Sequence, residues 1–125
     1  NNLINLVDKM FLGLRSQSLI RRSPLRNFAT SRDGFAYFET GVSTRFNDND
    51  VFGHMNNVIY YAFMDDVINA HLSERGIGIE VPRYVVSSGM QYMSALSYPG
   101  KVDIGLRIER LGKSSASYQV GIFAS

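Results

Sequence analysis

The chain has 125 residues, of which 45% are hydrophobic and 12% aromatic, enough for one domain with a buried core. It contains no cysteine, so disulfides, thiolate–zinc sites and cysteine nucleophiles are excluded. No apolar run approaches the roughly 20 residues that a membrane-spanning helix needs. We therefore expect a single domain without a membrane span.

Basic charge is concentrated near the N-terminus. Residues 10–28 contain four arginines and no acid. From residue 29 to the end, 8 basic and 10 acidic residues give a net charge of −2. The domain itself therefore lacks the strongly basic character of nucleic-acid-binding proteins, and we expect no nucleic-acid partner.

Residues 10–28 have the composition of an organellar transit peptide, because they are rich in arginine and serine and are interrupted by Pro24. The sequence Arg-Asn-Phe at 26–28, followed by a small residue, resembles a matrix-protease site. We expect residues 1–34 to be an N-terminal extension and the protein to be mitochondrial, with plastid or cytoplasm as alternatives. A basic tail without targeting function is the alternative interpretation.

The first nine residues match neither a transit peptide nor the domain, and Met10 is a candidate start.

The remaining chain has the order strand, long helix, strand, strand, strand, which is typical of an α+β domain. The helix has an apolar face, and Gly76 follows it as a natural stop. The residues of this face are Tyr60, Met64, Val67, Ile68 and His71, flanked by Tyr61, Phe63 and Leu72. The expected strands have apolar residues at period two and cover residues 35–46, 83–96, 102–111 and 114–123. The expected helix covers residues 57–75.

Residues that can carry chemistry gather in the turn between the first strand and the helix. Within residues 48–57 there are two acids, a glycine, a histidine and asparagines. Carboxylate and imidazole groups can perform acid–base chemistry on a carbonyl, and the free amides of a first helical turn favour negative charge. This turn is therefore the candidate functional site.

Several residues of the site have structural alternatives. Asp48 has the alternative of capping the turn through the local backbone, and Asp50 and His54 have alternatives as hydrogen-bonding turn residues. A calcium loop of the EF-hand type is excluded, because it would need Asp or Asn at Phe52 and Glu at Ile59. We expect no metal site.

His71 lies in the middle of the apolar helix face. There we expect a core histidine with satisfied hydrogen bonds and not a ligand.

The turn resembles the Asp-x-Asp-x-x-Gly-His-x-Asn-Asn-x-x-Tyr motif of hotdog-fold thioesterases of the 4-hydroxybenzoyl-CoA thioesterase type. The Tyr98-Pro99 corner and the Leu-Gly-Lys-Ser-Ser run at 111–115 also match that family. The resemblance covers residues 38–123 and implies an antiparallel sheet wrapped around one long central helix. It further implies an acyl-CoA thioesterase without a cofactor, assembled as a homodimer or homotetramer. The matching motif positions are Asp48, Asp50, Gly53, His54, Asn56, Asn57 and Tyr60.

The resemblance also implies roles for individual residues. Asp50 matches the catalytic carboxylate, acting as general base on water or as nucleophile. His54 and Asn57 are expected to orient water or thioester, while amides at the helix N-terminus bind the oxyanion. Expected substrate contacts are made by Gly53, Asn56 and Tyr60, and by basic groups for the coenzyme A phosphates at Arg83, Lys113 and Arg110.

Two departures from the family pattern matter. Some branches have a histidine at the position of Asn57, so a mechanism that uses it is not available here. Family members continue past the equivalent of Ser125 with another strand, so we expect the domain, residues 35–125, to lack its last strand. An open sheet edge would then be an aggregation risk.

Three other functions remain open at this point. An acyl-carrier-protein thioesterase would share the Gly-His-Met-Asn-Asn sequence. A hotdog dehydratase or hydratase uses a different arrangement of His and Asp. A non-catalytic hotdog module that binds acyl-CoA would not need the Asp50 carboxylate.

Overall fold

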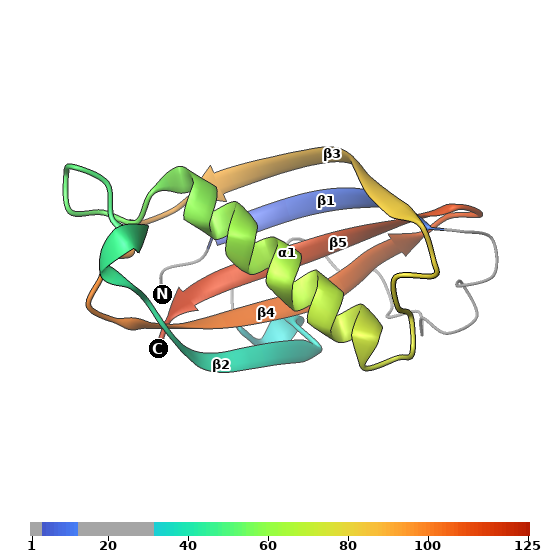
Figure 1. The fold of residues 1–125 in the computed structure, drawn as a ribbon, viewed down its shortest axis with the longest axis horizontal. Helices are drawn as coiled ribbons and strands as arrows, with labels where there is room; N and C mark the ends of the chain where they lie inside the picture. The colour runs from blue at the N-terminus through green and yellow to red at the C-terminus, as the bar shows by residue number, and fades with distance from the viewer. Residues whose placement is uncertain (1–3, 13–31) are drawn as a thin grey trace.

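In the computed structural model, one long helix lies across one face of a five-stranded antiparallel sheet (Figure 1). The structure describes residues 4–12 as backbone and residues 32–125 with their side chains. Within these ranges no helix is long and apolar enough to cross a membrane. In chain order the elements are β1 (Ile4–Leu12), η2 (Arg32–Gly34), β2 (Tyr37–Ser43), η3 (Phe46–Asp48), α1 (Asn57–Ser73), β3 (Arg83–Tyr92), β4 (Lys101–Leu111) and β5 (Ser115–Ala124).

The strands lie in the order β2-β4-β5-β1-β3, and all neighbours are antiparallel. This confirms the α+β class and the antiparallel sheet packed against one long helix, the arrangement of the hotdog fold. The strand and helix boundaries agree with the expected ranges to within a few residues. Strand β3 is shorter than expected, since it ends at Tyr92 and not at residue 96.

Residues 4–12 are the main departure from the expected fold. We expect residues 1–34 to be an extension outside the domain, but β1 pairs with β5 on one side and with β3 on the other. Six of the nine residues in this stretch are apolar, a composition that suits a central strand. The position between β5 and β3, which would be open without a further strand, is therefore filled by β1. Most of the predicted transit peptide, residues 13–31, lies outside the described residues.

Helix α1 buries the predicted face. Its N-cap is Asn56, whose Oδ1 accepts the Val58 N–H at 3.2 Å. It ends two residues before the expected position, and Gly76 follows with a φ of +71°. Each large side chain fully buried against β4 and β5 contributes about 1.5–3 kcal/mol. The buried residues of α1 are Tyr60, Phe63, Met64, Val67, Ile68, His71 and Leu72.

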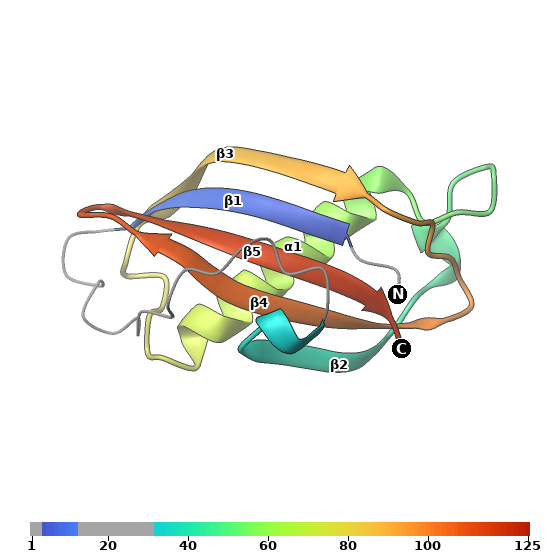
Figure 2. The same cartoon turned by 180° about the vertical axis from the view of Figure 1, so that it is seen from behind.

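On the other face of the sheet, where η2 lies (Figure 2), the ring of Phe35 packs against two glycines. Gly105 of β4 and Gly121 of β5 are paired in the ladder. A Cβ atom at Gly121 would lie 2.6 Å from the Phe35 ring, and one at Gly105 would lie 2.9 Å from it. Phe35 also packs edge-on against Phe123, with ring centroids 5.7 Å apart. The paired glycines thus leave space for the Phe35 ring, and the packing of this ring positions the chain before β2.

His71 is buried as expected, but its hydrogen bonds are not satisfied. The residue is 5% exposed, and neither ring nitrogen has a partner among the described residues. Its ring packs edge-on against Tyr37 at 5.1 Å, and the Tyr37 hydroxyl donates to Glu74 at 2.8 Å. Burial, assisted by Arg75 and opposed by Glu74, lowers the pKa of His71 from 6.5 to about 4.

This pKa predicts an acid-sensitive fold. Between pH 6.5 and 4 the unfolded chain binds a proton that folded His71 does not, so stability falls as the pH is lowered through this range. The free energy of unfolding should decrease by about 2 kcal/mol from pH 7 to pH 5 through this group. Urea unfolding of the wild type and of His71→Leu at both pH values measures it. Equal pH dependence in the two proteins would contradict the prediction.

Candidate active site

The turn between β2 and α1 is held at both ends by Asp48. Its carboxylate is 1% exposed and accepts the Arg45 N–H at 2.7 Å and the Arg45 Nε–H at 3.1 Å. Its carbonyl oxygen accepts the Asn56 N–H at 2.7 Å. Because a buried carboxylate is costly unless it is hydrogen-bonded, these bonds fix the start of the turn relative to the helix. Asp48 therefore caps the turn, as its structural alternative in the sequence analysis predicts.

The turn is also fastened to the Tyr98-Pro99 corner. The Asn49 side chain donates to the Tyr98 carbonyl at 3.2 Å and accepts the Tyr98 N–H at 2.8 Å. The Met55 N–H donates to the Leu96 carbonyl at 2.7 Å. Two segments that are about fifty residues apart in the sequence thus form one unit. The Tyr98-Pro99 corner therefore lies directly beside the candidate site.

Asp50 is half-buried inside this turn, and one of its carboxylate oxygens is fixed. Its Oδ1 accepts the Phe52 N–H at 2.8 Å and the His54 N–H at 3.1 Å. Its backbone N–H donates to the His54 carbonyl at 2.6 Å. Among the described residues no donor reaches Oδ2. The carboxylate is therefore oriented through one oxygen and has the other available to accept a proton.

Gly53 completes the turn around Asp50. Its φ is +78°, a conformation that residues with a side chain rarely adopt, and its N–H donates to the Asp50 carbonyl at 3.2 Å. A Cβ atom at this position would have nothing within 4 Å. The glycine is thus required by the backbone, and the space beside it is open.

His54 and Asn57 are exposed and lie with Asp50 in the same turn. Neither side chain forms a hydrogen bond with another described residue. The backbone N–H of Asn57, at the N-terminus of α1, also has no acceptor in the described part of the chain. A free amide at a helix N-terminus is suited to bind a negative oxygen. The turn therefore contains a half-buried carboxylate, an exposed imidazole and a free amide at the N-terminus of the helix.

Two predicted substrate contacts have structural partners. Asn56 caps α1 through Val58. Tyr60 is 2% exposed, and its hydroxyl oxygen accepts the Leu96 N–H at 3.2 Å. Burial raises the pKa of Tyr60, and the neighbouring Asp50 carboxylate adds to this against the Leu96 hydrogen bond. Tyr60 is therefore buried in the first turns of α1, and its phenol lies within electrostatic reach of the Asp50 carboxylate.

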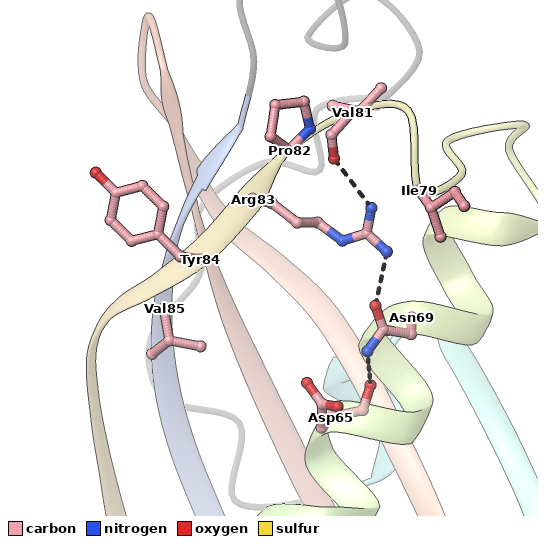
Figure 3. A pocket seen from close by; sticks show the side chains of 8 residues that line it. All are labelled: Asp65, Asn69, Ile79, Val81, Pro82, Arg83, Tyr84 and Val85. Atoms are coloured by element: carbon pink, nitrogen blue, oxygen red, sulfur yellow. Dashed lines mark hydrogen bonds between the residues drawn. The ribbon is translucent and has the colours of Figure 1, made fainter.

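Arg83 begins β3, at the end of this strand opposite the β2–α1 turn (Figure 1), and lies beside the second half of α1 (Figure 3). Its Nη1 donates to the Gly78 carbonyl at 3.0 Å and to the Val81 carbonyl at 3.4 Å. Its Nη2 donates to Asn69 Oδ1 at 2.8 Å, and Asn69 Nδ2 donates to the Asp65 carbonyl at 2.9 Å. The guanidinium thus joins the α1–β3 connection to the helix.

An open pocket of about 370 Å³ lies beside Arg83 (Figure 3). The sequence pattern does not indicate this pocket, because Asn69 falls on the polar helix face and the other wall belongs to the α1–β3 connection and the start of β3. An acid followed by an amide four residues later, on one helix face, is the signal that could have indicated it. The pocket is lined by Asp65, Asn69, Ile79, Val81, Pro82, Arg83, Tyr84 and Val85.

The remaining basic candidates are far from the turn that contains Asp50. Arg110 and Lys113 lie near the β4–β5 connection, at the end of the sheet opposite that turn (Figure 1). Within one chain the structure does not bring them to the site. Lys101 is not among the basic candidates. It begins β4, at the end of this strand away from the β4–β5 connection, and lines an open hollow with Tyr98.

Comparison with known proteins identifies relatives. The model of the thioesterase superfamily matches residues 52–125. The PA5185 protein from Pseudomonas aeruginosa strain PAO1 is 35% identical, with 73% of this chain and 78% of that chain covered and a TM-score of 0.61. The 12:0-ACP thioesterase from Umbellularia californica is 15% identical, with coverages of 87% and 41% and a TM-score of 0.49. No curated protein matches the chain.

The capping bond of Asn56 predicts how this position responds to substitution. Asn56→Ala should lower the free energy of unfolding by about 1 kcal/mol, because the Val58 N–H loses its acceptor. Asn56→Ser, which can also cap, should keep most of the stability. Urea unfolding of both variants measures the effect. A serine variant as unstable as the alanine variant would show that the cap is not what Asn56 supplies.

Proposed function

Because the chain belongs to the thioesterase superfamily, we propose that it hydrolyses acyl-CoA thioesters to free acid and coenzyme A. Thioester hydrolysis follows from the family, whereas the carrier and the catalytic residues are part of the proposal. The orientation of the Asp50 carboxylate is the observation that carries it. Two amides fix Oδ1, and Oδ2 has no donor in the described part of the chain.

In the proposed reaction Asp50 Oδ2 accepts a proton from water while the water oxygen attacks the thioester carbonyl. The negative oxygen of the tetrahedral intermediate lies against the Asn57 N–H at the N-terminus of α1. The carbon–sulfur bond then breaks, and the proton passes from Asp50 to the thiolate of coenzyme A. Direct attack by Asp50, giving a mixed anhydride that water hydrolyses, is the alternative route.

His54 and Asn57 have free side chains beside this carboxylate, which supports a role in orienting water or the thioester. The buried Tyr60 hydroxyl accepts the Leu96 N–H. A correctly placed catalytic group contributes about 10²–10⁴-fold to the rate. The proposed reaction needs no cofactor besides the coenzyme A that the substrate carries.

We also propose that the protein is a homodimer formed through β3. This strand is at the edge of the sheet, and Tyr84, Val85 and Val86 are 62%, 46% and 53% exposed. A long apolar edge strand is a site for pairing with another chain. The β3 strand of a second copy, paired antiparallel, would place its Arg83 end beside Tyr92, which packs on Tyr60. The pocket of one copy would then adjoin the active site of the other.

Replacing Asp50 tests the catalytic proposal. Asp50→Asn should lower kcat by about 10²–10⁴-fold, because the amide cannot accept the proton of water. Asp66→Asn, an exposed acid on α1, is the matched control and should keep full activity. Hydrolysis of short, long and aromatic acyl-CoAs, and of acyl-carrier-protein thioesters, is measured for all three proteins.

The substrates separate the alternatives. Turnover of carrier-protein thioesters without turnover of acyl-CoAs would show that the carrier is an acyl carrier protein and not coenzyme A. Acyl-CoA binding without hydrolysis by the wild type would show that the protein is a binding module and not an enzyme. Full activity of Asp50→Asn would overturn its catalytic role.

A charge at the edge of β3 tests the proposed dimer. Val86→Lys should shift the protein from dimer to monomer, because a lysine on an edge strand opposes pairing with another strand. Thr40→Lys, at an exposed residue of β2 on the opposite edge of the sheet, should leave the mass unchanged. Light scattering after gel filtration measures the mass. A dimer that survives Val86→Lys would place the interface elsewhere.

A further inference from the structure

One wall of the pocket depends on a strand from the other end of the sequence. Tyr84 and Val85 belong to this wall and are paired with Phe11 and Met10 of β1. The β1–β3 ladder extends from Ile4, opposite Tyr92, to the other end of both strands. In the part of the chain that the structure describes, β3 has no other strand neighbour.

Contacts other than this ladder hold β3 mainly at its ends. Arg83 at the start is bonded to Asn69 of α1. Tyr92 at the end packs against Tyr60, with ring centroids 5.3 Å apart. Between these two points the backbone hydrogen bonds of β3 are those to β1. The position of the middle of β3 therefore follows from whether β1 is in place.

The place of β1 in the sheet is defined by its neighbours and not by its position in the sequence. Strand β1 is antiparallel to both β5 and β3. It starts at Ile4, opposite Ile122, three residues before Ser125. A strand joined to Ser125 by a tight turn would enter the same place and run in the same direction.

We propose that the gap between β5 and β3 is an acceptor position for one strand, which β1 fills in this chain. Filling it joins β3 to β5 through β1 and keeps the β3 wall of the pocket in place. Because the position is specified by backbone pairing on both sides, a copy of the strand that arrives from another point of the chain can occupy it. This inference concerns the scaffold and does not depend on the proposed chemistry.

The first test breaks the β1 ladder in the full chain. Val7→Pro removes a backbone N–H from the middle of a central strand, whereas Val7→Ala keeps it. Hydrogen exchange should become at least tenfold faster at the β3 amides of the proline variant, with no such change in the alanine variant. The β4–β5 ladder and α1 should keep their protection. Unchanged protection of β3 in Val7→Pro would overturn the proposal.

The second test supplies the strand from the other end. A copy of residues 4–12 is joined after Ser125 of the Val7→Pro chain through a short turn that contains glycine. Exchange at the β3 amides should return to within about twofold of the wild type, and a copy with scrambled sequence should give no recovery. This comparison also holds if Val7→Pro alone unfolds the protein, because recovery of the fold is then the readout. No recovery with the native copy would overturn the acceptor position.

Discussion

The buried Asp48 carboxylate is the constraint on which the candidate site depends. A carboxylate at 1% exposure must have its hydrogen bonds supplied by the protein, and Arg45 supplies them from the start of the turn. The Asp48 carbonyl in turn receives the Asn56 N–H at the helix cap. The turn between these points is therefore closed by hydrogen bonds of the protein itself. Asp50 is oriented by the same closed backbone, since its Oδ1 receives two amides of the turn.

Local patterns in the sequence predicted the helix and the site turn well. The buried face of α1 is the predicted face, because a period of 3.6 residues is a local property that packing on a sheet preserves. The motif from Asp48 to Tyr60 is also mainly local, because the backbone hydrogen bonds between its own residues span at most eight residues, although the Met55 N–H donates to the distant Leu96 carbonyl. Asp48 and Asn56 have capping bonds, which are likewise set by neighbours in the chain.

Features that depend on contacts between distant residues could not be predicted in this way. Arg83 was selected for its charge, but its donors are directed to the carbonyl groups of its own connection and to Asn69. Lys113 is likewise selected for its charge, but it follows the far end of β4, a strand about 30 Å long. The place of residues 4–12 in the sheet depends on partners more than seventy residues away. None of these partners can be identified from charge or periodicity alone.

The paired glycines beneath Phe35 restrict how this chain can diverge. Gly105 and Gly121 lie opposite each other on neighbouring strands, and a methyl group on either would lie within 3 Å of the Phe35 ring. A small residue at position 35 alone would not make room, because a Cβ atom at Gly105 would also lie 2.8 Å from Phe38 and one at Gly121 would also lie 2.9 Å from Phe123. A side chain at either glycine position therefore requires changes in two aromatic rings at once. Across relatives the glycine pair should covary with the three aromatic positions 35, 38 and 123 together, and not with residue 35 alone.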